Sequence, residues 1–150
     1  MFTNIGRQVI SGLLRHSSPT VVFMNGSSYN VDINSNTLTP TTARYNQTGT
    51  GCSLILSTNN AGSEASTNMT GIINLGATSV ANGVDATGNY ILTYIFTNTS
   101  GSTLNIKSIG LGVRQTSAID RCCLAIWRDV PERSVENNET FTFTIKFNIV

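Results

Sequence analysis

The sequence predicts an all-β fold, a single β-sandwich or jelly-roll-like domain of about eight strands with a short N-terminal helix or extended arm. Two observations predict it. From residue 17 onward, short runs of apolar and β-branched residues are separated by turn-forming residues at close spacing. Residues 140–149 then alternate without a break between polar and apolar side chains.

The C-terminal segment, residues 140–150, has the clearest pattern in the chain. In an extended strand its apolar residues share one face, which must lie on a second layer of structure. The opposite face carries threonines and Lys146, which meet water or a neighbouring subunit. We therefore predict a core strand here. Its apolar face consists of Phe141, Phe143, Ile145, Phe147 and Ile149.

Seven further strands are expected before this one. Asn25-Gly26 is a strong signal for a tight turn between the first two. Residues 77–89 contain several turn formers and are expected to be a loop, and Pro131 is expected to end the seventh strand. The expected strands cover residues 20–24, 29–33, 52–57, 69–75, 90–97, 104–113 and 119–128, with 43–46 as a brief further candidate.

Two of these strands carry apolar residues on both faces. Residues 90–97 alternate Tyr, Leu, Tyr and Phe with Ile and Thr, which favours a central strand covered on both sides. In residues 119–128, strict alternation places two groups on opposite faces of the strand. One group is Leu124 and Ile126, and the other is Cys123, Ala125 and Trp127.

The first fifteen residues carry apolar side chains at helical spacing. With Thr3 or Asn4 as the candidate cap, they suit a short amphipathic helix over residues 4–15. Gly6 and Gly12 weaken that helix, because glycine costs about 1 kcal/mol relative to alanine in a helix interior. An extended arm that docks on a neighbouring subunit is the alternative interpretation.

The chain divides into this N-terminal helix or arm, residues 1–18, and a β-sandwich domain, residues 19–150. The N-terminal segment is more apolar than a free surface segment should be, and its glycines make it a poor independent helix. We therefore predict that it packs against another subunit. The predicted contact residues are Phe2, Ile5, Val9 and Leu13.

Charge is sparse along the whole chain. Charged residues make up 11% of it, and the net charge is +1. Nucleic acids and anionic membranes are bound mainly by clustered cations, so neither is an expected partner. A surface with so few charges also gives a free monomer little protection against association. Such a surface is better suited to a protein that partner subunits partly cover.

No pattern in the sequence predicts catalysis or a cofactor. The single histidine, His16, stands beside Ser17-Ser18-Pro19 and is expected at the surface. Cys122 and Cys123 are adjacent and lack the spacing of zinc ligands, so these and Cys52 are expected to be small buried hydrophobes in a reducing cytoplasm. Residues 82–89 offer oxygen atoms to a calcium ion, but an ordinary turn is the simpler interpretation.

Charged residues gather at the two ends of the expected strand 119–128. Asp120-Arg121 precedes it, and Arg128-Asp129 and Glu132-Arg133 follow. One interpretation is a seam of ion pairs between subunits, with Arg121 and Arg128 as its basic members. The other is pairing within the chain, which contributes less than about 1 kcal/mol for each exposed pair.

The C-terminal third, residues 90–150, carries a series of architectural motifs. Their residues are Phe96, Thr97, Asn98, Ile106, Ile109, Gly110, Leu111, Arg128, Val130, Pro131 and residues 139–147. Over about 60 residues, this series resembles small β-sandwich structural proteins of tailed-bacteriophage virions. In that family, a Phe-Thr-Asn… Ile-x-x-Ile-Gly-Leu hairpin is followed by an Arg-x-x-x-Pro segment, which is one residue shorter here, and by a last strand of alternating Thr, Phe and Ile. Asn137-Asn138 stands where many of them have glycine, and asparagine tolerates the same left-handed backbone.

This resemblance implies a non-enzymatic virion protein, assembled in the cytoplasm of the bacterial host. It would form an oligomer on the head, as a decoration or accessory protein, or at the neck or tail, as an adaptor, ring or fibre component. Its partners would be the major capsid, portal, neck or tail proteins and further copies of itself. The alternative is a glycan-binding module for host recognition, with tyrosines and Trp127 as its aromatic platform.

Overall fold

The computed structural model describes residues 3, 4, 6–8, 20–31, 39–44, 46–47, 51–114 and 122–147. Strands account for 54% of these residues and helix for 4%, so the predicted all-β, sandwich-like fold is confirmed. The nine strands of the described residues are β1 (Thr20–Val22), β2 (Ser28–Asn30), β3 (Gly51–Ser57), β4 (Ile72–Ile73), β5 (Ser79–Val84), β6 (Tyr90–Thr97), β7 (Leu104–Arg114), β8 (Cys122–Val135) and β9 (Thr140–Phe147).

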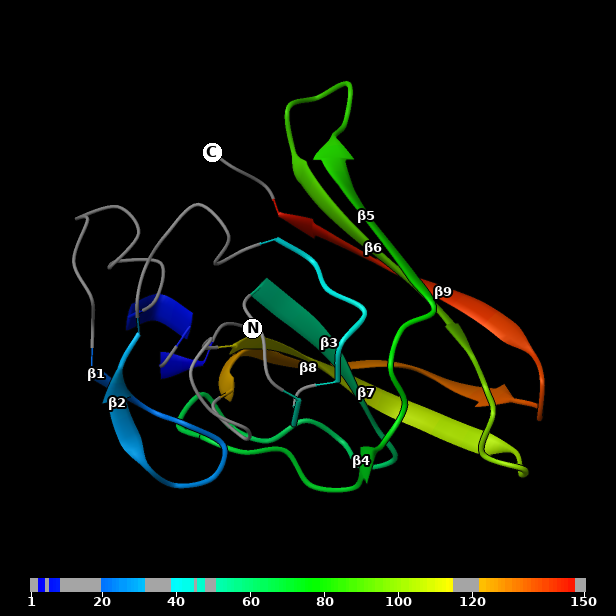
Figure 1. Cartoon of the computed structure of the whole chain (residues 1–150), viewed down its shortest axis with the longest axis horizontal. Helices are drawn as coiled ribbons and strands as arrows, with labels where there is room; N and C mark the ends of the chain where they lie inside the picture. Colours follow the sequence, from blue (N-terminus) through cyan, green and yellow to red (C-terminus); the bar gives the residue numbers. More distant parts are fainter. Residues whose placement is uncertain are drawn as a thin grey trace.

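The strands form three antiparallel sheets (Figure 1). A four-stranded sheet has the order β4-β3-β7-β8, and a three-stranded sheet has the order β5-β6-β9. The β1-β2 hairpin forms a small third sheet. The expected turn at Asn25-Gly26 joins its strands, and Gly26 adopts a φ of 84°, which glycine reaches without strain.

The four-stranded sheet is buried on both faces over β3, most of β7 and the first half of β8, whereas the second half of β8 is largely exposed. Its inner face joins the main core with residues such as Leu54, Leu56 and Leu111. Its outer face joins a second apolar cluster that includes Met69, from the loop before β4. A Cβ on Gly110 would lie 2.1 Å from the sulfur of Met69, so glycine in β7 lets this loop lie directly on the sheet.

The three-stranded sheet has one covered face and one more open face. β6 lies between β5 and β9, so its predicted central position is confirmed, but its second face is only partly buried and not covered by another layer. Leu92, Tyr94 and Phe96 of β6 are fully buried. In β9, Phe141 is 2% exposed, whereas the alternating Thr140, Thr142, Thr144 and Lys146 are exposed.

Two expectations about the strand bounds are wrong. β5 lies in residues that are expected to form a loop. The sequence does not predict this strand because nearly all of its residues are exposed, so they show no alternation of apolar and polar side chains. Pro131 does not end β8, which continues to Val135. The register of β7 with β8 shifts between Ile106 and Ser108, opposite this proline, and an irregular position in an edge strand accommodates a residue that has no N–H.

The predicted alternation in β8 also fails. A second register shift lets Leu111 pair with Ile126 and Gly112 with Leu124, which leaves Ala125 as an extra residue. Leu124 therefore packs with Trp127 in the outer cluster, while Ile126 packs in the main core. The sequence alone does not signal this bulge, because all the residues around it are apolar.

The start of the chain is held by this bulge. Thr3 N–H donates to the Ala125 carbonyl at 3.0 Å. Asn4 and residues 6–8 are helical, and Gly6 N–H donates to Thr3 Oγ1 at 2.9 Å, so Thr3 is the N-terminal cap. Arg7 pairs with Glu64. The described part of the N-terminal segment therefore lies on its own domain.

Candidate functional site

A groove lies between the two main sheets, and we call it the inter-sheet groove. It has a volume of about 580 Å³, within the range of ligand and peptide sites. The groove is lined by β7, β8 and β9, and most of its side chains are apolar. The lining residues are Ile109, Leu111, Ile126, Arg128, Asp129, Val130, Pro131, Phe143, Thr144, Ile145, Lys146 and Phe147.

The groove exists because the sheets converge at one end of the domain and diverge towards the other. Figure 1 shows them closest where β6 turns into β7 and β8 turns into β9. There the rings of Phe96 and Phe141 stack with centroids 5.4 Å apart, and both side chains are buried. Further along β9, Phe143 and Ile145 are only partly buried. Their exposed parts form one wall of the groove.

Asn98 holds the two turns together at the closed end. Its side-chain N–H groups donate to the carbonyls of Ser102, Val135 and Glu136 at 2.8–3.1 Å. Its side-chain oxygen accepts from the N–H of Ser100 at 3.0 Å. Asn98 is fully buried, so these bonds replace the hydrogen bonds to water that its side-chain amide loses on folding.

The turn after β8 meets Asn98 from the other side. Asn138 N–H donates to the Asn98 carbonyl at 2.7 Å, and Asn98 N–H donates to the Glu139 carbonyl at 2.9 Å. Asn138 has a φ of 67°, the left-handed backbone that the sequence comparison with glycine-bearing turns led us to expect there. Asn98 and Asn138 therefore join the two turns at the closed end of the groove.

The rim of the groove is polar. Lys146 Nζ lies 2.5 Å from Asp85 Oδ2, which ties the end of β9 to the β5–β6 turn. Asp85 also accepts bonds from the N–H groups of Thr87 and Asn89. The Lys146 ammonium and these N–H donors lower the pKa of Asp85 well below its ordinary value. This carboxylate is thus the anchor of a turn, as the simpler interpretation of residues 82–89 expected.

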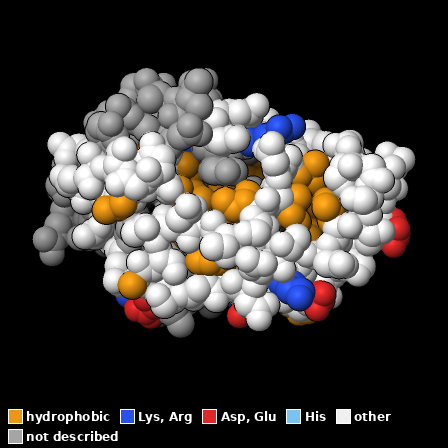
Figure 2. Space-filling model, turned by 90° about the horizontal axis from the view of Figure 1, so that it is seen from below, with side chains coloured by type: hydrophobic (Ala, Val, Ile, Leu, Met, Phe, Trp, Pro, Cys, Tyr) orange, Lys and Arg blue, Asp and Glu red, His pale blue; other side chains and the backbone are white. Residues whose placement is uncertain are grey.

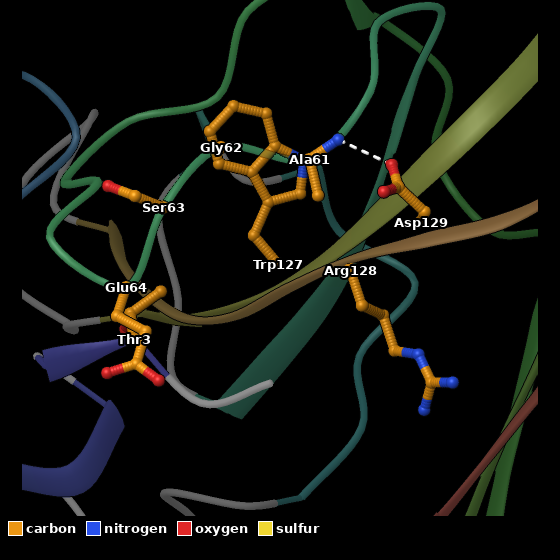
Figure 3. Close-up of a pocket in the computed structure, with 8 residues that line it drawn as sticks. All are labelled: Thr3, Ala61, Gly62, Ser63, Glu64, Trp127, Arg128 and Asp129. Atoms are coloured by element: carbon orange, nitrogen blue, oxygen red, sulfur yellow. Dashed lines mark hydrogen bonds between the residues drawn. The ribbon is translucent and has the colours of Figure 1, made fainter.

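A smaller hollow, of about 200 Å³, lies beside Trp127 (Figure 3). The indole ring packs against the loop that contains Gly62, and a Cβ on this glycine would lie 2.6 Å from ring atom Cζ3. The indole N–H donates to Ser108 Oγ at 2.9 Å. Asp129 accepts from the N–H of Ala61, while Arg128 points away from the hollow. Trp127 is 7% exposed, so its ring is a packing element and not an open platform.

The surface carries few charges. Figure 2 shows one face of the molecule, on which hydrophobic side chains lie in hollows between uncharged polar ones. Of the clustered charges near β8, Glu132 lies 3.9 Å from Lys107, and Arg133 lies 3.1 Å from Glu139. All four of these side chains are about 40–60% exposed, so the pairs contribute little to stability.

The predicted interface residues fall mainly outside the described part of the chain. This holds for the backbone or side chains of Phe2, Ile5, Val9, Leu13 and Arg121, for Ile149 of the last strand, and for His16. Arg128 is exposed at the rim of the inter-sheet groove. The sequence pointed to the wall of the groove formed by β9. The opposite wall had no sequence signal, because residues such as Leu111 and Ile126 read as ordinary core.

The three cysteines are free and buried, as expected. Burial raises the pKa of Cys52 to about 11 and that of Cys123 to about 12, and it raises the pKa of Cys122 as well. The thiolate is the reactive form of cysteine, so the folded protein holds all three thiols in an unreactive state.

We expect these thiols to resist a disulfide reagent in the native protein at pH 8 and to react fully in denaturant. Because their folded pKa values exceed the unfolded value of about 8.5, the native state binds more protons than the unfolded state above that pH. Stability is therefore fully present below about pH 8.5 and falls as the pH rises towards 11–12. Thiol titration and urea midpoints between pH 7 and 10.5 measure both effects. Native-state labelling at the unfolded rate would contradict this description of the core.

Comparison of the chain with protein-family models, with curated proteins and with solved structures finds no match. Within the described residues, no group of three His, Cys, Asp or Glu side chains is placed to hold a metal ion. The same residues contain no helix that is long and apolar enough to cross a membrane.

Proposed function

We propose that this chain is a non-enzymatic structural protein of a tailed-bacteriophage virion, which assembles with other virion proteins and with copies of itself. The observation that carries the proposal is the inter-sheet groove. It is open, mostly apolar and bordered by a polar rim, which is the composition of a protein-docking surface. A chain with 11% charged residues would leave such a surface poorly protected as a free monomer.

The residues that carry the resemblance to virion proteins support the proposal in a second way. Three of them have an architectural role in this fold. Asn98 joins the two turns, Gly110 lets Met69 lie on the sheet, and Pro131 lies opposite a register shift. A pattern that specifies this framework is what a family of assembly modules would share.

The glycan-binding alternative has less support among the described residues. Tyr94 and Trp127 are buried, and the Tyr94 hydroxyl donates to the carbonyl of Cys52 at 2.8 Å. Tyr90 is partly exposed, and its hydroxyl accepts from the side chain of Asn82. A sugar platform needs open aromatic faces, which the first two rings do not offer.

The test is to purify the particles of the phage that encodes the chain and to measure its copy number per particle by mass spectrometry. We expect a fixed copy number set by the symmetry of the head, neck or tail, and a matching density when the particle is imaged. Deletion of the gene should remove that density and leave the other proteins in place. Absence of the chain from purified particles would overturn the proposal, and specific binding on a glycan array would replace it with the alternative.

A further inference from the structure

Within the described residues, no strand pairs with the outer edge of β9. β9 is the last strand of its sheet in the described residues and is hydrogen-bonded to β6 on one side. Asn98 N–H donates to the carbonyl of Glu139, the residue opposite it, so this bond shows which residues of β9 form hydrogen-bonded pairs with β6. Because bonding alternates along an antiparallel pair, Phe141, Phe143 and Ile145 direct their N–H and C=O groups to β6. Thr142 and Thr144 direct theirs outward.

Among the described residues of the two main sheets, the other edge strands are protected, and β9 is not. At β8, the Cys122 carbonyl accepts from Met24 N–H at 2.8 Å and the Ala125 carbonyl accepts from Thr3. Further along β8, Pro131 and several charged residues discourage pairing. β4 has two residues, and β5 carries small or polar side chains apart from Val80 and Val84, so pairing there would bury little apolar surface. β9 has eight residues, a half-buried apolar face, no proline and no bulge.

We propose that a second copy of this chain pairs with β9, edge to edge and antiparallel, so that the two three-stranded sheets become one six-stranded sheet across a two-fold axis. Charge decides the direction of pairing. Parallel strands in register would place Lys146 beside Lys146 of the second copy, and like charges directly opposite each other are destabilising. In antiparallel pairing, Lys146 lies opposite a threonine of the second copy. This is Thr140 if the two-fold axis passes at Phe143, and Thr142 if it passes at Thr144.

The same arrangement closes the inter-sheet groove. A two-fold axis perpendicular to the sheet puts the apolar faces of both copies of β9 on one side, so Phe143 and Ile145 gain apolar neighbours from the second copy. The two grooves then face each other across the axis. This inference deepens the proposed assembly function, because it names the partner at that surface and the strand that binds it.

The first test is the mass of the full-length protein in solution, measured by light scattering and analytical ultracentrifugation. We expect twice the mass of one chain at micromolar concentration. Thr144→Pro should give a folded monomer, because the N–H of Thr144 faces outward and its removal costs no bond to β6. A monomeric wild-type protein, or a Thr144→Pro protein that is folded and still dimeric, would overturn the inference.

A milder pair of variants covers the case in which the proline prevents folding. Thr142→Lys with Thr144→Lys adds two charges at the β9 edge and should raise the dimer Kd at least about tenfold. The matched control, Ser79→Lys with Ala81→Lys, adds the same charge at the exposed β5 edge of the same sheet. The Kd of the control should stay within about twofold of the wild type. Equal weakening by both pairs would show that charge and not the β9 edge controls association.

Cysteine cross-linking distinguishes antiparallel from parallel pairing. The native thiols are buried, so they should contribute little cross-linking of their own. Antiparallel pairing places Thr142 opposite Thr142, Thr144 opposite Thr144, or Thr142 opposite Thr144, according to register. One of three results is therefore expected: only Thr142→Cys cross-links as a single variant, only Thr144→Cys does, or neither does and only a mixture of the two cross-links. Cross-linking of both single variants to the same extent would indicate parallel pairing and overturn the inference.

The two proposals fail independently. A chain that is present in particles but monomeric in solution, and that incorporates normally as Thr144→Pro, would remove the β9 dimer and leave the virion role. A β9-paired dimer that is absent from purified particles would remove the virion role and leave the dimer.

Discussion

Replacement of Asn98 by alanine is expected to lower the free energy of unfolding by about 3–5 kcal/mol. The variant loses the bonds from the side-chain amide and leaves the buried carbonyl of Val135 without its donor. Each buried polar group without a partner costs about 1–3 kcal/mol, and a domain of this kind has about 5–15 kcal/mol in total. Urea denaturation followed by the fluorescence of Trp127 measures the change.

Asn105 is the matched control for this variant. It is exposed, and its side-chain oxygen accepts one bond from Ser134 Oγ at 2.7 Å. Asn105→Ala should therefore change the unfolding free energy by less than about 0.5 kcal/mol. A loss of less than 1 kcal/mol in Asn98→Ala would mean that the two turns are held by packing and not by this amide.

The sequence predicts those parts of the fold in which one face of a strand meets water. The alternation in β9 and the turn at Asn25-Gly26 are local patterns, and the structure has both. The double-sided burial of β8 removes the contrast between faces, so the bulge at Ala125 has no signal in the sequence. β5 fails for the opposite reason, because an exposed edge strand has no apolar period.

The inter-sheet groove depends on a relation between two sheets, which no local pattern encodes. Its β9 wall could be anticipated, because a phenylalanine and an isoleucine alternate with threonines there. Its other wall belongs to β7 and β8, whose apolar residues look the same whether they meet a partner or the core. The role of Asn98 is similarly hidden, because three of its acceptors lie on segments that come after it in the chain.

Replacement of Phe141 by aspartate is expected to abolish folding. Phe141 is 2% exposed and stacks on Phe96, so the variant loses about 3–5 kcal/mol of packing and also buries an unpaired charge. Phe143→Asp should lower the unfolding free energy by less, because position 143 borders the open groove, where the carboxylate of the new aspartate can reach water. Thr142→Asp, on the exposed face between them, should cost less than about 0.5 kcal/mol.

This order of effects tests the divergence of the sheets directly. Urea midpoints of the three variants would be measured at dilution, so that association through β9 does not add to the stability of any of them. Phe141→Asp should be unfolded without denaturant, Phe143→Asp should unfold at a lowered midpoint, and Thr142→Asp should match the wild type. Equal effects at Phe141 and Phe143 would show that the second phenylalanine is fully enclosed. The groove would then be closed within one chain, and its exposed apolar wall could not serve as a docking surface.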